Sequence, residues 1–191
     1  MSAPVDPVDH LRDLAATALR AADTLADDIR AATALVRETV ASGGLLMFCG
    51  NGGSAADAQH IATEYVVRYQ RTRKALRAIA LTTDTSLLTA TANDFSFDEV
   101  FARQVEALGR AGDLLVLHTT SGNSPNCLRA VEAAKKLGVR TLVLTAKDGG
   151  KIRAMADLCL VVPTTRTDRA QEIHLAIQHS ICDVIDEETS R

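Results

Sequence analysis

Residues 45–60 decide the fold, and they read Leu45-Leu46-Met47-Phe48-Cys49-Gly50-Asn51-Gly52-Gly53-Ser54-Ala55-Ala56-Asp57-Ala58-Gln59-His60. The apolar start predicts a buried strand. Gly50, Gly52 and Gly53 predict a turn in which the backbone takes positive φ and a ligand can approach closely. Ser54 and Asp57 have the S-x-x-D spacing of a capping box, which predicts a helix beginning at Ser54. The stretch therefore forms a strand, a turn and a helix.

This unit combines two features that suggest chemistry. The free amides and the positive dipole end of the predicted helix face the turn and favour an anion there. His60 and Glu64 are four residues apart, so they lie on one face of the helix. Such a pair is by itself more often a surface contact than a site. Together, the two features predict a phosphate-type cradle and an acid/base or metal pair on one element.

Composition limits the class of protein. The chain has 191 residues, enough for one domain with an extra helix, and 47% of them are hydrophobic while only 3% are aromatic. The net charge of −3 argues against a general nucleic-acid surface. Its N-terminus lacks the regions of a signal peptide, and its apolar runs are shorter than a membrane span. The scattered cysteines are interpreted as reduced packing residues, so we expect a soluble cytoplasmic protein without membrane or nucleic-acid partners.

Residues 6–42 contain no glycine and carry apolar residues at helical spacing, which predicts one long helix. Its apolar stripe must pack on the domain body or on another subunit. We therefore divide a single domain, residues 1–191, into an N-terminal oligomerisation helix at 6–42 and an α/β core at 43–188.

Strands and helices alternate along that core. Further strands are predicted at 76–81, 114–118, 139–145 and 158–162, and further helices at 97–108, 125–136 and 169–188. This alternation predicts an α/β fold with a three-layer, doubly wound, five-stranded parallel sheet. Ligands bind such sheets at the carboxyl ends of the strands. Residues 50–54, 82–86 and 119–124 would all emerge there.

The loop Thr119-Thr120-Ser121-Gly122-Asn123-Ser124 offers four hydroxyl groups and no basic residue. Ser124 can cap a helix whose first residue is Pro125. Hydroxyls, amides and the helix dipole can hold a phosphate dianion without a lysine or arginine. Neither glycine-rich segment contains a dinucleotide or P-loop fingerprint, so a sugar phosphate is the better interpretation than a nucleotide.

The last predicted helix carries an unusual density of polar and titratable groups, namely Gln171, Glu172, His174, Gln178 and His179. Each one alone is more often a solvated or internally paired side chain than a catalyst. Together with His60 and Glu64, they can form a His/His/carboxylate group that binds zinc or moves protons.

Here the chain resembles the phosphoheptose isomerases, which are sedoheptulose 7-phosphate isomerases of the sugar isomerase (SIS) fold. The resemblance covers about residues 6–188, with its motifs in the family's order and spacing. These motifs are Gly50 to His60 with Glu64, Asn93-Asp94, Thr120 to Ser124, and Gln171-Glu172-Ile173-His174 with His179. It implies a flavodoxin-like strand order behind a long N-terminal helix.

The resemblance also implies an activity and its residues. Sedoheptulose 7-phosphate and D-glycero-D-manno-heptose 7-phosphate would interconvert through a cis-enediol, with Glu64 as the base and His179 as its acid/base partner. Zinc, one ion per site, would be bound by His60, Glu64, Gln171 and His179. The family is a homotetramer with sites between subunits. Its sugar-phosphate contacts match Asn51, Gly52, Gly53, Ser54, Glu64, Asn93, Asp94, Thr119, Thr120, Ser121, Ser124 and Gln171.

Two points stay open on the sequence. Zinc ligation weakens a carboxylate base, so metal binding and proton abstraction compete at Glu64, and the metal is either catalytic or structural. The chain has His118-Thr119 where the family usually has a small or apolar residue followed by serine. His118 is then either a packing residue or one that narrows the sugar pocket, and this departure concerns the choice of substrate.

Three other functions compete with this one. The chain could isomerise a different ketose phosphate, or it could be a non-catalytic SIS module that binds a sugar phosphate or a partner protein. The presence of both Glu64 and His179 argues against such a module. A nucleotide-binding doubly wound domain is the weakest alternative, because the fingerprints are missing. The sequence does not specify the product anomer or the downstream pathway.

Overall fold

A computed structural model describes residues 6–190 and contains one five-stranded sheet in which every paired strand is parallel. The strand order is β2-β1-β3-β4-β5, which is the flavodoxin-like order. The strands are β1 (Leu46–Gly50), β2 (Ala78–Ala80), β3 (Leu114–His118), β4 (Arg140–Ala146) and β5 (Leu158–Val162). The predicted fold class is therefore confirmed.

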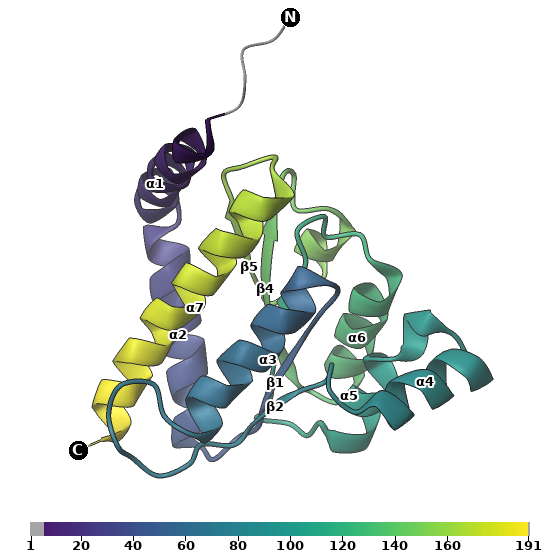
Figure 1. Ribbon diagram of the computed structural model, residues 1–191. Coiled ribbons are helices and arrows are strands. Elements are labelled where there is room, and N and C mark those ends of the chain that lie inside the picture. Colours follow the sequence, from purple (N-terminus) through teal and green to yellow (C-terminus); the bar gives the residue numbers. More distant parts are fainter. Residues whose placement is uncertain (1–5, 191) are drawn as a thin grey trace, which may run out of the picture.

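Helices cover both faces of the sheet (Figure 1). The helices are α1 (Pro7–Thr24), α2 (Ala26–Ala41), α3 (Gly53–Val66), α4 (Thr85–Asp94), α5 (Ala102–Leu108), α6 (Pro125–Lys136) and α7 (Thr167–Thr189), with short 3₁₀ turns at η1 (Phe97–Glu99) and η2 (Lys151–Ala154). The single helix predicted over 97–108 is thus a 3₁₀ turn followed by α5. None of the helices in the described part of the chain is both long and apolar enough to cross a membrane.

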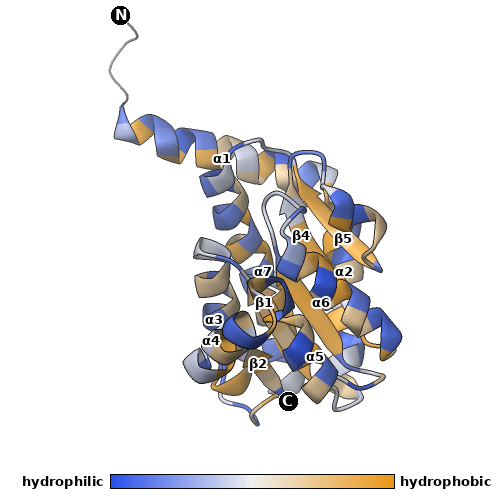
Figure 2. Ribbon diagram, turned by 90° about the vertical axis from the view of Figure 1, so that its right-hand side faces the viewer, coloured by the Kyte–Doolittle hydropathy of each residue, from blue (hydrophilic) through white to orange (hydrophobic). Residues whose placement is uncertain are grey.

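Strands β1, β3, β4 and β5 supply side chains to two separate cores, because successive strand residues point to opposite faces of the sheet. Phe48 and Val116 lie in the core beneath α2, α3 and α7, while Leu115 and Leu117 lie in the core beneath α5 and α6. The central strands are accordingly apolar along their length (Figure 2). Burial of each large apolar side chain stabilises the fold by about 1.5–3 kcal/mol.

The helix predicted over 6–42 is divided into α1 and α2 at Leu25, whose backbone leaves helical geometry at φ −113°, ψ 11°. Leu25 is buried, and α1 projects away from α2 at an angle (Figure 2). Neither glycine nor proline marks the break. Asp27 and Asp28 in the first turn of α2 are the local signal for a helix start, since carboxylates favour that end of the dipole.

The capping box predicted at Ser54 is wrong. Helix α3 begins at Gly53, and its N-cap is Gly52 at φ 58°, ψ −122°, a conformation that favours glycine. Ser54 lies inside the first turn and is buried. The tight turn after β1 therefore starts the helix earlier than the side-chain spacing indicates.

A buried carboxylate fixes the loop that follows α3. Asp186 on α7 is fully buried and accepts hydrogen bonds from the backbone amides of Gln70 (3.0 Å) and Arg71 (2.6 Å) and from Arg73 Nε (2.9 Å). The Arg73 guanidinium also donates to the Tyr65 and Glu64 carbonyls near the end of α3. Burial raises the pKa of the Asp186 carboxyl, but these donors and the Arg73 charge outweigh it and lower the pKa.

We predict that Asp186→Asn lowers the free energy of unfolding at pH 7 by about 3–5 kcal/mol, because it leaves Arg73 buried without a counter-charge. The carboxylate contributes stability above its unfolded pKa, and this contribution is lost as the pH falls through its lower folded pKa. In urea denaturation, the free energies of unfolding of the wild type and of Asp186→Asn should therefore converge as the pH is lowered. Asp183→Asn is the matched control, since this exposed partner of Arg71 should contribute at most about 1 kcal/mol. Equal effects of the two variants would contradict this role.

Candidate active site

A pocket of about 270 Å³ opens at the carboxyl ends of β1 and β3. It lies at the switch point of the sheet order, where ligands bind in doubly wound folds. Its lining residues come from the turn after β1, the end of β3 with its loop, and the start of α7. They are Asn51, Gly52, Gly53, Ser54, His118, Thr119, Thr120, Ser121, Ser124, Thr167 and Gln171.

The N-termini of three helices meet at this pocket, marked by Gly53 of α3, Ser124 before α6, and Thr167 of α7. Each contributes amides without intrahelical partners and the positive end of a helix dipole. Among the residues that line it in the described chain there is no lysine or arginine. The pocket thus suits an anion held by amides and hydroxyls, as the 119–124 loop predicts.

Ser124 occupies the N-cap position of α6 as predicted, but its side chain makes no capping hydrogen bond. Its hydroxyl is therefore available to a ligand. Asn51 is held from the side, because its amide exchanges hydrogen bonds of 2.9 and 2.8 Å with Asn126 in the first turn of α6. This pairing ties the glycine turn to the hydroxyl-rich loop.

Helices α3 and α7 lie side by side and begin at the same edge of the sheet (Figure 1). At their N-terminal ends they approach so closely that a Cβ on Gly53 would lie 2.7 Å from Gln171 Nε2. A glycine at this position thus leaves room for the Gln171 amide at the mouth of the pocket.

Further along the same two helices, His60, Glu64 and His179 come together. The Nε2 atoms of His60 and His179 lie 2.9 Å apart, and His60 Nε2 is 3.5 Å from Glu64 Oε1. Tyr69, from the loop that Asp186 fixes, stacks on the His179 ring with centroids 5.6 Å apart. The predicted His/His/carboxylate group is therefore formed by these three residues.

Burial lowers the pKa of His179 and the neighbouring His60 lowers it further, while Glu64 raises it. The net shift of the pKa is downward, so His179 is neutral at pH 7, with one ring N–H that can donate a proton and one nitrogen that can accept a proton or bind a metal. The ligand atoms of the three residues all lie within 4.8 Å of one another. Two imidazoles and a carboxylate form a donor set that suits zinc.

The other polar residues of α7 do not join this group. His174 and Gln178 are fully buried, and Glu172 pairs with Arg169. Gln171, predicted as a fourth zinc ligand, precedes His179 by eight residues, or about 12 Å along the helix. Its amide lies beside Gly53 in the pocket, away from the histidines of the same chain.

The predicted site residues thus fall into three separate places in one chain. Glu64 follows Gly53 by eleven residues, so it is about 16 Å along α3 from the pocket. Asn93 and Asp94 are exposed at the end of α4, where the Asn93 amide donates to the Asp94 carboxylate over 2.8 Å. They contribute to neither the pocket nor the histidine group of their own chain.

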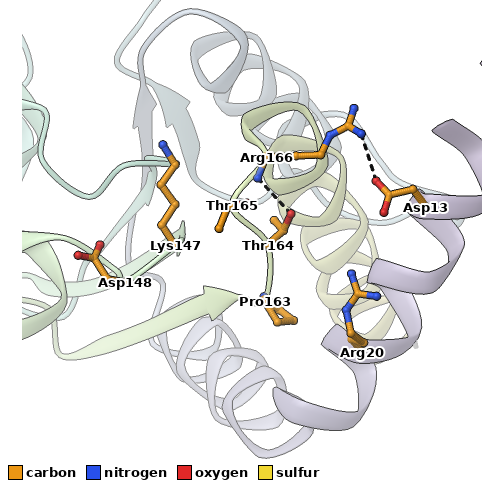
Figure 3. Close-up of a pocket in the computed structure, with 8 residues that line it drawn as sticks. All are labelled: Asp13, Arg20, Lys147, Asp148, Pro163, Thr164, Thr165 and Arg166. Carbon is orange, nitrogen blue, oxygen red and sulfur yellow. Dashed lines mark hydrogen bonds and ion pairs between the residues drawn. The ribbon is translucent and has the colours of Figure 1, made fainter. Parts of the chain in front are cut away.

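A larger cleft of about 780 Å³ lies between α1 and the loop before α7 (Figure 3). Its charged groups are of both signs, and Arg166 is held by Asp13 and Asp168. The residues lining this cleft include none of the predicted site residues. The smaller, hydroxyl-lined pocket is therefore the candidate ligand site.

Two residues of the pocket region carry no role in the sequence-based prediction, since Thr167 lines the pocket and Asn126 orients Asn51. His118, for which the sequence leaves packing or narrowing of the pocket open, is a lining residue at the end of β3. The helix-start position of Thr167 is a detectable signal, since N-terminal residues of helices at this sheet edge face the ligand. The Asn51–Asn126 pair has no sequence signal, because the two residues are far apart in the chain.

Comparisons with known proteins identify the family to which this fold belongs. The SIS domain family model matches residues 9–146. A phosphoheptose isomerase from Chlorobaculum parvum is 56% identical over 163 residues, covering 84% of this chain and 78% of its relative. One from Akkermansia muciniphila is 47% identical over 169 residues, covering 88% and 89%. The solved structure of phosphoheptose isomerase GmhA from Neisseria gonorrhoeae superposes with a TM-score of 0.88 at 45% identity, covering 94% and 96%.

We predict that Gly53→Ala folds with a melting temperature close to that of the wild type, because the new Cβ meets only the mobile end of Gln171. The displaced amide should weaken binding of inorganic phosphate in the pocket by roughly tenfold, the effect of about 1.4 kcal/mol. Calorimetric titration measures this affinity. The control is Gly43→Ala, a glycine at φ 73° with open space around it and outside the pocket, which should strain the backbone without altering phosphate affinity. Unchanged affinity in Gly53→Ala would contradict the assignment of the pocket.

Proposed function

The chain belongs to the SIS domain family and, within it, to the phosphoheptose isomerases, and we propose that it interconverts sedoheptulose 7-phosphate and D-glycero-D-manno-heptose 7-phosphate. The observation that carries the proposal is the group of His60, Glu64 and His179, which joins a carboxylate to a neutral imidazole. An aldose–ketose isomerisation needs such a base and such an acid, together with a grip on the phosphate that lies outside the reacting carbons.

The phosphate end of the substrate would bind in the pocket at the start of α3, α6 and α7. Hydroxyls of Thr120, Ser121 and Ser124 supply hydrogen bonds there, and the helix dipoles supply positive potential. These contacts hold only the phosphate, so they orient the substrate while leaving its reacting carbons accessible. Asn51, Gly52, Gly53, Ser54, Thr119 and Gln171 complete the proposed contacts.

Glu64 would act as the base. Starting from the ketose, its carboxylate removes a proton from C1 while His179 delivers a proton to the oxygen on C2, which gives the cis-enediol. Glu64 then returns its proton to C2, and the hydroxyl on C1 gives its proton to His179 as the aldehyde forms, which restores both residues. The Glu64 side chain is 18% exposed, so it is largely enclosed and still accessible to a substrate.

We propose zinc as the cofactor of this group, held by His60, Glu64 and His179, with Gln171 as a further ligand only if it comes from another chain. When bound, the ion supplies a Lewis acid that polarises the carbonyl oxygen. The Nε2 atoms of His60 and His179 point at each other, an arrangement that suits a shared cation as well as a shared proton.

The proposed active form is a homotetramer with each site between subunits. The distance of about 16 Å along α3 between Gly53 and Glu64 places the two halves of the site apart in one chain. A second chain can bring its catalytic group, or its Asn93 and Asp94, to the pocket of the first. Helix α1 offers an apolar contact surface, since Val8, Leu11 and Leu19 are 48%, 68% and 69% exposed. A single domain comprising this helical arm and the core fits such an assembly.

We also propose that the protein works in the cytoplasm. Its cysteines within the described residues are all free, as expected in a reducing compartment.

The test incubates the protein with sedoheptulose 7-phosphate in D₂O, with and without added zinc. We expect the aldose to form with deuterium at C2, because the base exchanges its proton with solvent before returning it. Glu64→Gln should lower kcat by at least about 100-fold, the usual contribution of a general base. NMR and mass spectrometry measure the deuterium, and metal analysis of the same samples measures bound zinc.

The matched control is Glu106→Gln, an exposed carboxylate paired with Arg103. It should keep wild-type activity. Full activity in Glu64→Gln would refute the assigned base, while absence of both aldose and deuterium under every metal condition would refute the isomerase. Faster deuterium incorporation into another ketose phosphate than into sedoheptulose 7-phosphate would indicate that the other sugar is the substrate.

A further inference from the structure

His118 is the last residue of β3 and lines the phosphate pocket, with only 1% of its surface exposed. Strand alternation sets its direction. Leu114 and Val116 pack in the core beneath α3 and α7, so His118, two residues on, lies on that same face. His118 therefore lies at the floor of the pocket, on the face of the sheet that α3 and α7 cover.

Both ring nitrogens of His118 are buried and have no hydrogen-bond partner among the described residues. A neutral imidazole carries one N–H donor and one acceptor, and leaving such groups unpaired in the interior is costly. Buried polar groups in folded proteins are almost always paired. A group that lines a cavity and has no protein partner therefore points to a partner within the cavity.

The surroundings of His118 keep its ring neutral. Its pKa falls to about 3, because burial and, to a smaller extent, the neighbouring His174 lower it, while the Ser54 backbone raises it only in part. His174 stacks at 6.2 Å between ring centroids and pairs its own Nε2 with the Thr145 carbonyl over 3.1 Å. His174 thus makes a hydrogen bond to the backbone, whereas neither ring nitrogen of His118 makes one with the described residues.

We propose that His118 is a substrate-binding residue that donates a ring N–H to the phosphate of the bound sugar phosphate. This inference rests on the proposed function, because it assigns the phosphate to this pocket. The pocket holds three helix N-termini and no lysine or arginine, so a neutral donor at its floor adds a hydrogen bond without adding a charge. A phosphate oxygen has free lone pairs to accept this bond.

The alternative is that His118 serves only in packing. The stability of a variant distinguishes this role from ligand binding. A side chain kept for packing should cost stability when it is replaced. A side chain kept for a ligand leaves unpaired atoms in the free protein, so an apolar replacement of similar size should not destabilise it. The His118→Leu variant tests this difference, and His118→Gln restores a neutral N–H donor.

The experiment measures, for each variant, the melting temperature and the calorimetric affinity for inorganic phosphate and for sedoheptulose 7-phosphate. For His118→Leu we expect a melting temperature at or above the wild type and a loss of affinity for both ligands of roughly 10- to 100-fold, as for one hydrogen bond to a charged group. KM should rise by a similar factor with kcat little changed, because the contact is the same in ground and transition states. His118→Gln should recover much of the affinity.

A second measurement uses the wild-type protein, so it does not depend on the folding of a variant. With ¹⁵N-labelled histidine, saturation with inorganic phosphate should shift the His118 ring resonances and slow exchange of the ring N–H. Unchanged resonances at saturation, or wild-type phosphate affinity in a folded His118→Leu, would overturn the proposal. A lower melting temperature with unaltered affinity would assign His118 to packing instead.

These readouts separate the inference from the proposed function. If the wild type binds both phosphate ligands through His118 but forms no aldose, the isomerase proposal fails and the role of His118 stands. If it forms aldose while His118→Leu binds as tightly as the wild type, the role of His118 fails and the isomerase stands. Absence of phosphate binding to the wild type would overturn both.

Discussion

The side-by-side packing of α3 and α7 is the constraint on which the site depends. Both helices begin at the carboxyl edge of the sheet and bury apolar residues in the same core, so their relative position is fixed by that core. At their start, Gly53 admits the Gln171 amide to the pocket, and further along, His60 and His179 meet within 2.9 Å. The loop held by Asp186 then places Tyr69 on His179. One helix pair thus borders both the proposed phosphate pocket and the proposed acid/base group of His60, Glu64 and His179.

The proposed phosphate pocket would hold its anion with dipoles and hydroxyls, since there is no lysine or arginine among its described lining residues. Such a site relies on geometry, because amides and hydroxyls bind well only when they are directed at the ligand. The turns around the pocket accordingly have fixed geometries. Gly52 adopts positive φ to start α3, the Asn51–Asn126 pair joins the turn to the opposite loop, and Gly122 approaches Gly149 so closely that a Cβ would lie 1.9 Å from its carbonyl oxygen. The phosphate end is therefore preorganised before any ligand arrives.

Much of this structure could be predicted from local patterns. The five strands, the flavodoxin-like order and the position of the 119–124 loop at the sheet edge follow from periodicity, from alternation and, for the order, from the resemblance. The failures have physical causes. Gly52 rather than Ser54 caps α3, because the turn geometry overrides the side-chain spacing. The division at Leu25 has no glycine or proline to announce it. Which polar residues of α7 face α3 depends on tertiary packing, so the sequence grouped His174 with His179 although only His179 reaches His60.

In the proposed assembly, one active site combines the phosphate pocket of one chain with the catalytic group of another. Co-expression of Glu64→Gln chains with chains carrying Ser121→Ala and Ser124→Ala tests it most directly. Each variant alone should be nearly inactive. If pocket and base come from independently drawn chains, about a quarter of the sites in an equal mixture combine two intact halves, and the mixed assembly should recover about a quarter of the wild-type activity. Mixed assemblies that stay as inactive as their parents would show that each chain builds its site alone and would contradict the account.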